Sequence, residues 1–390
     1  ILEMREGKLE RLKMGGMGTL DYREMTLEVG GKPSDRIRSI RHYDQADADI
    51  RVGRDALKTA LRSGLFIAAA TDAKTSILFS PQEPLSADEL DVIDILGNSL
   101  LLDQLLPAGP VAVGHTWKPE SALLAMLLAL DSVGQNNVKC EVVEVTDTVA
   151  RFQITGSLSG TIYGAATQIQ LKAKYRYDRR SKRIDWFAMS MKEEREVGLI
   201  AEGFDIVAQV QVRIVPEQGN AGFDQKKLDQ WVLEPNDTVV ALAYESADSA
   251  WRLTHSRDWY VIHSTPDLAI FRLIDQGRRV AECRISALPD VPREKLPTLE
   301  SFQNDVRNTL GDAFDHFVSA SQWANEAKYR VYRVAVSGQA QSDAKLGKVK
   351  VPIEWRYYLV ADDYGRRVAF VVTVEEELLK QLGDADRELV

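Results

Sequence analysis

Three residues with the chemistry of a hydrolytic triad lie close together in the chain: His255, Ser256 and Asp258. In a triad the histidine takes the proton of the serine hydroxyl, and the carboxylate orients the histidine. Triad members normally come from separate segments, because residues this close on a strand and its turn rarely converge at hydrogen-bond distance. The sequence therefore predicts no triad here.

A second nucleophile pattern fails at its central residue. Residues 156–160 have the sequence Gly-Ser-Leu-Ser-Gly. The strained turn that exposes a nucleophilic serine needs that serine at position 158, which is Leu158. We predict a tight β-turn instead.

The cysteines and histidines do not have metal-binding spacing. Cys140 and Cys283 are far apart, with no Cys-x-x-Cys and no cysteine–histidine cluster, so no structural zinc site is expected. Both are predicted to be small buried hydrophobic side chains, with a disulfide between them as the alternative. His115 and His263 are lone histidines, for which a structural hydrogen bond is favoured over metal ligation.

The acidic and glycine clusters also have structural explanations. Residues 375–377 are glutamates at a predicted helix N-terminus, where negative charge suits the helix dipole. Asp362 and Asp363 predict a hairpin turn, with weak calcium binding as the alternative. The glycines within residues 15–18 lack the spacing of a phosphate-binding loop. We predict no catalytic, cofactor-binding or metal site and expect no enzyme activity.

The elements that would position any site are mainly strands. Residues 167–177 alternate between apolar and polar side chains, which indicates a long strand with one buried and one hydrated face. Further strands are predicted over residues 19–29, 36–42, 48–52, 66–70, 76–79, 138–145, 150–157, 161–177, 183–192 and 204–215. Together they predict a curved antiparallel sheet, closed on one side only.

Two helices are predicted to lie against this sheet. Ser86 and Glu89 form a capping box that begins the first. Residues 122–130 are apolar on every side, so the second helix must be covered all round. The nearby aromatic residues could line an apolar cavity for a lipid tail or pack against this helix, and packing is favoured because the helix must be buried; they are Tyr175, Tyr177, Trp186 and Phe187.

Length and composition predict two domains. We expect a β half-barrel with plugging helices over residues 1–215, a linker over 216–234 and an α/β sandwich over 235–390, giving an α+β chain. Thr298 is expected to cap a helix beginning at Leu299, and a last helix is expected near residues 375–389.

The net charge of the chain and its first residue give expectations about binding partners and cellular location. A net charge of −9 argues against general nucleic-acid binding, and no apolar run is long enough to span a bilayer. Because the chain begins at Ile1, we expect a mature or trimmed form whose signal sequence or lipid anchor, if any, preceded that residue.

One resemblance covers roughly residues 20–215. The segment from Leu106-Pro107 through Val111-x-Val113-Gly114-His115-Thr116-Trp117 resembles a motif of exported bacterial proteins that look like relatives of the lipoprotein carriers. That resemblance implies a half-open β-barrel with helices in its mouth. It also implies an extracytoplasmic location and the handling of lipid or another apolar molecule, with no catalytic residue.

A second resemblance covers about residues 235–390. Several segments of this region resemble the PsbP/Mog1-like α/β/α sandwich. They are Leu253-Thr254-x-x-x-x-Trp259, Leu299-Glu300-x-Phe302 and Trp355-x-Tyr357-Tyr358-Leu359, the last of which is followed by Gly365-Arg366-Arg367-Val368-Ala369-Phe370. Ser256 stands near the place of the usual proline. Members of that fold mainly bind proteins, and no metal position carries over.

These observations predict a non-catalytic envelope protein that binds a protein partner or an apolar ligand. A structural subunit of a cell-surface assembly is the first alternative, and an enzyme without a recognisable motif is the second. The identity of the ligand or partner and the oligomeric state are not determined by the sequence.

Overall fold

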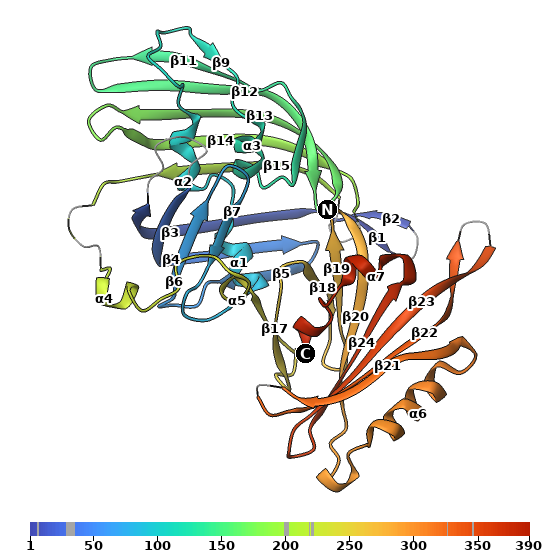
Figure 1. Ribbon diagram of the computed structural model, residues 1–390. Helices are drawn as coiled ribbons and strands as arrows, with labels where there is room; N and C mark the ends of the chain where they lie inside the picture. Colours follow the sequence, from blue (N-terminus) through green and yellow to red (C-terminus); the bar gives the residue numbers. More distant parts are fainter. Residues whose placement is uncertain are drawn as a thin grey trace. The chain divides into compact units, whose positions relative to one another are not determined.

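The computed structural model describes residues 1–5, 8–28, 36–198, 203–217, 219, 222–325, 327–344 and 347–390. The chain forms two compact units, Ile1–Val240 and Ala241–Val390, and each is described by itself (Figure 1). No helix in these residues is both long and apolar enough to cross a membrane.

The larger sheet of the first unit is a curled antiparallel half-barrel of seven strands (Figure 1). Its order is β15-β14-β13-β12-β11-β9, and β10 also pairs with β12. The strands are β9 Thr116–Trp117, β10 Ser132–Asn136, β11 Lys139–Val145, β12 Val149–Ile162, β13 Ala165–Asp178, β14 Arg183–Arg195 and β15 Phe204–Arg213. The predicted curved antiparallel sheet is confirmed for the strands from residue 116 onward, whereas the predicted strands before residue 80 form a separate sheet.

Strand β13 has the alternation predicted from its sequence. From Ala165 to Arg176, buried and exposed side chains alternate without interruption. Ile169 and Leu171 face the core, and Lys172 faces solvent on the opposite side. The strand therefore has one apolar face and one hydrated face.

The predicted turn at residues 156–160 is wrong, because this segment lies inside β12. β11 and β10 pair with successive parts of β12, and Gly156 lies where one partner gives way to the other. At Gly156 φ is +146°, and a Cβ would lie 2.3 Å from the Asn137 carbonyl oxygen, so the strand requires glycine there. The hairpin turn is instead at Tyr163 and Gly164, whose positive φ angles of 49° and 74° suit a two-residue connection.

The smaller sheet of the first unit has the order β3-β4-β6-β7, with β5 paired to β4. Its strands are β3 Met14–Glu28, β4 Ile37–Val52, β5 Asp55–Ala60, β6 Phe66–Thr71 and β7 Ser76–Phe79; the short strands β1 Leu2–Arg5, β2 Lys8–Arg11 and β8 Leu85–Ser86 lie outside it. Gly15, Gly16 and Gly18 continue β3 rather than interrupt it. β4 is one strand where two were predicted, because its whole length pairs with β3.

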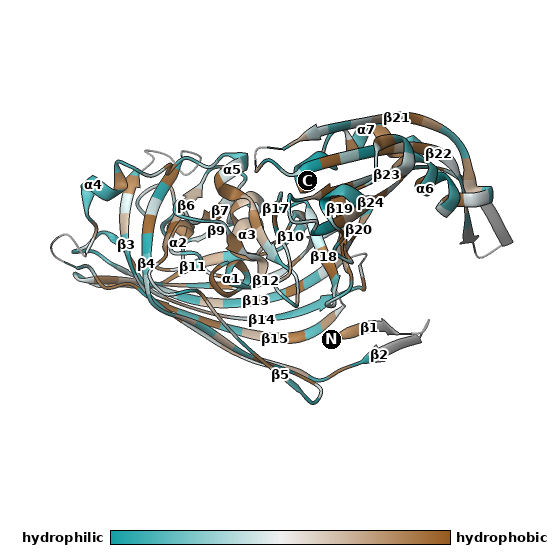
Figure 2. Ribbon diagram, turned by 90° about the horizontal axis from the view of Figure 1, so that it is seen from below, coloured by the Kyte–Doolittle hydropathy of each residue, from teal (hydrophilic) through white to brown (hydrophobic). Residues whose placement is uncertain are grey.

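Short helices lie on the inner side of the curled sheet (Figure 2). α1 Ala87–Ile93 begins with the predicted capping box of Ser86 and Glu89. The chain then turns at Gly97, where φ is +83°, and continues as α2 Ser99–Leu102 and η1 Asp103–Leu105. α3 Ser121–Leu127 buries Leu124 completely but leaves Ala122 and Ala129 beside it exposed, so the segment is covered on its leucine side rather than all round.

The later part of the predicted linker packs on the smaller sheet. α4 Gln225–Leu228 and α5 Asp237–Val240 lie in this stretch. Phe223 and Leu228 are buried in one cluster with Ile40 of β4 and Phe79 of β7. Residues 222–240 therefore belong to the first unit, and the two units divide after Val240.

The second unit is built on a seven-stranded antiparallel sheet of order β18-β19-β20-β24-β23-β22-β21. β16 and β17 form a further hairpin. The strands are β16 Leu242–Glu245, β17 Arg252–His255, β18 Trp259–Ser264, β19 Ala269–Asp275, β20 Arg278–Leu288, β21 Phe314–Ala324, β22 Arg330–Ala344, β23 Gly347–Ala361 and β24 Arg367–Glu375; η2 Arg293–Lys295 and η3 Gly311–Ala313 are short helical turns.

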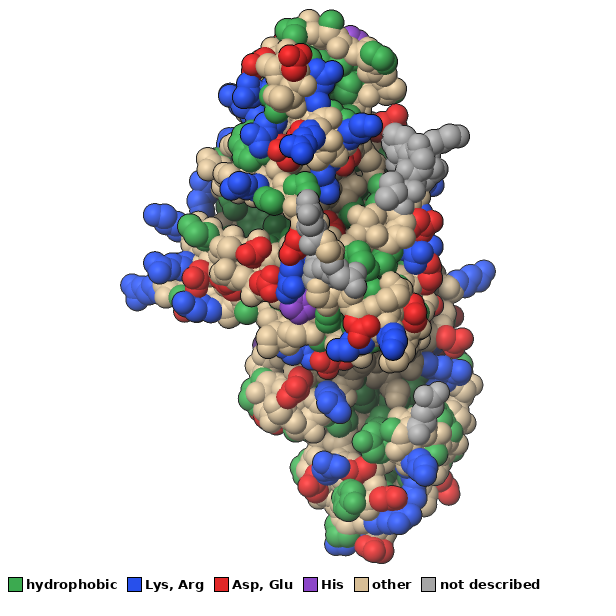
Figure 3. Space-filling view, turned by 90° about the vertical axis from the view of Figure 1, so that its left-hand side faces the viewer, with side chains coloured by type: hydrophobic (Ala, Val, Ile, Leu, Met, Phe, Trp, Pro, Cys, Tyr) green, Lys and Arg blue, Asp and Glu red, His purple; other side chains and the backbone are tan. Residues whose placement is uncertain are grey.

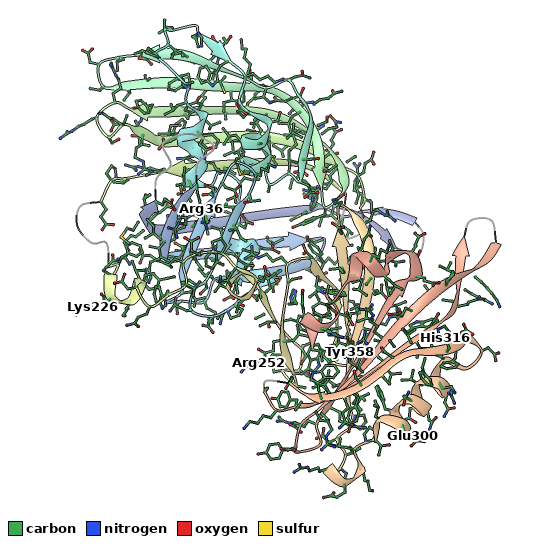
Figure 4. The ribbon with its side chains drawn as sticks, viewed as in Figure 1. Arg36, Lys226, Arg252, Glu300, His316 and Tyr358 are labelled. Atoms are coloured by element: carbon green, nitrogen blue, oxygen red, sulfur yellow. The ribbon has the colours of Figure 1, made fainter. Side chains whose placement is uncertain are left out.

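Both faces of this sheet are covered by apolar contacts. Tyr358 lies on β23 (Figure 4), and its neighbour Tyr357 on the same strand points to the opposite face of the sheet. Tyr357 packs in the cluster of α6 Leu299–Leu310, whose N-terminus is capped by Thr298 as predicted. Tyr358 packs in a cluster with the C-terminal leucines Leu378 and Leu382.

The predicted C-terminal helix is divided into three short turns. The three turns are η4 Glu376–Leu378, α7 Leu379–Leu382 and η5 Arg387–Leu389. The helix is interrupted because the chain reverses at Gly383, where φ is +53°. α6, with 12 residues, is the longest helix that the described residues form. The chain is therefore mostly β, with fewer helical residues than the predicted α+β class.

Candidate ligand-binding site

A pocket of about 910 Å³ lies in the first unit, between β3 of the smaller sheet and β15 of the larger one. The segment that follows α1 lines a third side. The surface is visibly hollowed there, with hydrophobic side chains in the hollow (Figure 3). Its apolar lining includes Met17, Ile50, Ile95, Leu96, Val210 and Val212.

The pocket exists because two sheet edges face each other without pairing. β15 ends the order of the larger sheet, and β3 ends that of the smaller sheet. Inward side chains of β13 are fully buried, whereas Val210 and Val212 on β15 are only half-buried. Gly97 brings the segment after α1 against these two valines, since a Cβ there would lie 3.4 Å from each of them. Apolar surface is thus exposed inside a concave space, which is typical of a ligand site.

A buried ion pair lies at the smaller-sheet side of the pocket. Arg41 Nε donates to Glu24 Oε1 at 2.8 Å, and the Arg41 side chain is only 3% exposed. The guanidinium also lies over the Tyr22 ring, 5.0 Å from its centroid. Register places Arg41 opposite Glu24 on the neighbouring strand β3, so the pair is fixed by the sheet itself.

Hydroxyl and amide groups satisfy the Glu24 carboxylate and part of the Arg41 guanidinium. Ser39 Oγ donates to Glu24 Oε1, and Ser99 Oγ donates to Glu24 Oε2. Arg41 Nη2 donates to Asn98 Oδ1 at 2.6 Å and to Ser99 Oγ at 3.1 Å. Burial by itself raises the pKa of Glu24, but Arg41 and these hydrogen bonds more than offset it, so the pKa lies below its ordinary value.

Donors remain in excess at this end of the pocket. Within the described residues the buried hydroxyl of Tyr43 donates to no partner, and it lies beside the Arg41 guanidinium. Arg183 also lines the pocket, and its buried Nε is likewise unpaired. Burial raises the pKa of Tyr43 to about 12, with the nearby Arg41 charge acting in the opposite direction, so the phenol stays protonated. These groups can donate to a ligand that carries an acceptor.

Asp91 lines the pocket at the end of α1, and its charge is disfavoured there. Burial of the carboxyl in the pocket wall, followed by repulsion from Asp88 and Asp94, raises its pKa to about 6. A raised carboxyl pKa means that stability is lost as pH rises from the ordinary value of 3.8 through 6.

We therefore expect Asp91→Asn to be more stable than the wild type above pH 6, with the difference disappearing below pH 4. The gain should stay below about 1 kcal/mol, because the Asp91 side chain, although it lies in the pocket wall, keeps enough contact with solvent for its charge to be screened. Urea unfolding at several pH values measures this difference. A gain that is independent of pH would contradict the explanation.

The four aromatic residues weighed as a cavity lining do not line this pocket. Tyr175 and Phe187 are buried in the core of the larger sheet, as the packing interpretation expects. Tyr175 stacks on Phe152 at 4.8 Å and donates its hydroxyl to the Leu105 carbonyl oxygen at 3.1 Å. Tyr177 packs at the margin of the same core, and Trp186 is half-buried on the opposite face of β14 from Phe187.

The discounted triad residues do not assemble. His255 Nδ1 lies 2.8 Å from the backbone oxygen of Ser256 rather than bonding its hydroxyl. Burial lowers the pKa of His255, while its backbone hydrogen bonds act in the opposite direction. Burial and the neighbouring Asp275 raise the pKa of the Asp258 carboxyl. The arrangement holds the strand β17 and the turn after it.

The other residues considered for chemistry have structural surroundings. Cys140 and Cys283 are free, buried thiols in different units, as the packing interpretation predicts. His115 is exposed and stacks near Trp117, and His263 is exposed on β18. Asp362 accepts from the backbone of Tyr364 and from Arg366, which closes the predicted hairpin turn.

Sequence reasoning did not single out Glu24, Arg41 or Tyr43. Their signal is the alternation Ser39, Arg41, Tyr43 along β4, which places polar residues on the face that would otherwise be apolar. Only the pairing of β4 with β3 shows that these groups meet each other beside a pocket.

Comparison with known proteins finds structural similarity for only part of the chain. No protein-family model matches the sequence, and no curated protein matches it either. The Ran-binding protein Mog1p of Saccharomyces cerevisiae matches over 38% of this chain and 84% of its own, at 12% identity and a TM-score of 0.26. A single-residue mutant of protein Mog1 matches over 38% and 85%, at 13% identity and a TM-score of 0.26. The predicted resemblance is thus found as a Mog1-like structural match, and at these values it carries no argument about function.

Proposed function

We propose that the protein is a non-catalytic binding protein that holds an amphipathic or apolar small molecule in the pocket between β3 and β15. The observation that carries this proposal is the pocket itself, about 910 Å³ in volume, whose lining combines apolar side chains such as Val210 and Val212 with charged ones such as Asp91 and Arg183. Its size lies at the upper end of the range of small-molecule sites.

The proposed setting is the cell envelope. The curled sheet with helices on its inner side supports a lipoprotein-carrier-like architecture for the first unit (Figure 2). The apolar clusters on both faces of the seven-stranded sheet in the second unit support the assignment of that unit as an α/β/α sandwich. In this proposal the first unit holds the ligand, and the second binds a protein partner.

A pocket-filling variant tests the proposal. Val212 points into the pocket from β15, whereas Val207 on the same strand lies on the other face and is 64% exposed. We expect Val212→Trp to lower affinity for the neutral fluorescent probe N-phenylnaphthylamine by roughly tenfold or more, because the indole occupies the space of the probe. Val207→Trp is the matched control and should bind as the wild type does.

Fluorescence titration of the full chain measures both variants, and native mass spectrometry of the purified protein adds a search for bound lipid. Equal unfolding midpoints of the two variants ensure that lost binding reflects the pocket. A wild-type protein that binds neither probe nor lipid, or a Val212→Trp variant that binds as well as Val207→Trp, would overturn the proposal.

A further inference from the structure

We infer that the ligand of this pocket is a single-chain amphiphile with a carboxylate head, and that the head is held by Tyr43 and Arg41. This inference rests on the proposed function and adds the chemical class of the ligand. It starts from the surplus of donors beside the pocket and not from the apolar lining.

Two donors on one face of β4 make the head site. Tyr43 is 7% exposed and Arg41 is 2% exposed, and both line the pocket. They are two residues apart on one strand, so their side chains point to the same side of the sheet. Within the described residues Tyr43 Oη donates to no partner, and its neighbour Arg41 already donates from Nε and Nη2. A buried donor without a partner is costly, so a ligand acceptor placed there regains a hydrogen bond that the free protein lacks.

The acceptors in this cluster are already used. Glu24 Oε1 accepts from Ser39 and Arg41, and Glu24 Oε2 accepts from Ser99. The ligand group that meets Tyr43 must therefore supply an acceptor rather than a donor, although Asp91 and Asp94 also line the pocket. The guanidinium faces one carboxylate already, so a head with a single negative charge suits the site better than a doubly charged phosphate.

The rest of the pocket accommodates the chain of such a molecule. From the polar end at β4 the lining continues over Leu20 of β3 and over Val210 and Val212 of β15. Apolar walls that meet a few convergent polar groups are the usual arrangement for a ligand of mixed character.

Calorimetric titration of the full chain with four amphiphiles of equal chain length tests the head group: dodecanoate, dodecyl phosphate, dodecanol and dodecyltrimethylammonium. We expect dodecanoate to bind tightest. Tyr43→Phe should weaken dodecanoate binding roughly tenfold, the loss of one hydrogen bond to a charged group.

Two further variants keep the test decisive. Tyr175→Phe makes the same chemical change at a buried tyrosine outside the pocket and should leave dodecanoate binding unchanged. The double variant Glu24→Gln with Arg41→Gln removes the guanidinium without stranding a buried carboxylate, and it should lose the preference for dodecanoate over dodecanol.

The outcomes separate this inference from the proposed function. If no amphiphile and no neutral probe binds, the proposed function fails. If the probe binds but the four heads bind equally, if phosphate or ammonium binds tightest, or if Tyr43→Phe leaves dodecanoate affinity unchanged, the carboxylate assignment alone is overturned.

Discussion

Asp386→Asn is expected to destabilise the second unit by about 3–5 kcal/mol, the cost of breaking a buried ion pair from one side. Asp386 is completely buried and accepts from Arg356 Nη1 at 2.5 Å and from the Tyr358 hydroxyl. Arg333 Nη2 lies 3.7 Å from the same carboxylate. When the Asp386 charge is lost, the buried guanidinium groups of Arg333 and Arg356 lose a negative charge that offsets the cost of removing them from water.

The contacts around Asp386 explain why its loss should spread. Arg333 Nε donates to Tyr358, and Arg356 Nε donates to Glu354, so the carboxylate joins β22 and β23 to the C-terminal turns. Burial, followed by the charge of Asp386, raises the pKa of Tyr358, which keeps its hydroxyl available as a donor. The indole of Trp259 donates to the Ala385 carbonyl beside this site and supplies a fluorescence probe.

Denaturant unfolding of the full chain, together with hydrogen exchange of the β23 amides, measures the effect. Asp384→Asn is the matched control, two residues away, where the side chain is 84% exposed and its contact with Arg387 is a surface pair. That control should change stability by less than about 1 kcal/mol. Equal losses in the two variants would show that the buried network does not hold the C-terminal turns.

Arg41→Met is expected to cost the first unit about 3–5 kcal/mol, because it leaves the Glu24 carboxylate buried without its cation. The serine hydroxyls of Ser39 and Ser99 continue to donate to Glu24 but do not neutralise it. The depressed pKa of Glu24 sets the pH dependence: the stability it contributes is present above its ordinary pKa of 4.5 and is lost as pH falls through the lower folded-state value.

A double variant separates the pair from its individual charges. Arg41→Met combined with Glu24→Gln should recover most of the lost stability at neutral pH, because no uncompensated charge then remains buried. Arg38→Met is the control on the same strand, since Arg38 pairs with Glu28 and Glu234 near the surface, and it should cost less than about 1 kcal/mol. Urea unfolding at neutral pH compares the variants, and no recovery in the double variant would contradict this account.

Much of the fold could be predicted from patterns that act within a few residues. The alternation in β13 indicates its buried face, and the Ser86 and Glu89 capping box locates the start of α1. Thr298 likewise marks the start of α6. These predictions hold because strand periodicity and helix capping depend on neighbouring side chains alone.

Predictions failed where a distant partner decides the local structure. Residues 156–160 resemble a turn, but pairing with β13 on one side and with β11 and β10 on the other keeps them extended. The segment after residue 222 has linker composition, yet Phe223 and Leu228 bury their side chains against the smaller sheet. A local sequence pattern does not show which distant strand or sheet the segment will contact in the folded chain.

The sequence by itself determined a β-rich chain with a strand face that must be buried and a leucine-rich helix to cover it, because both follow from local side-chain periodicity. Only the tertiary structure decided that β3 and β15 end their sheets facing one another across a pocket. It also decided that Arg41, Glu24 and Tyr43 meet beside that pocket, since strand register brings together residues that lie far apart in the chain.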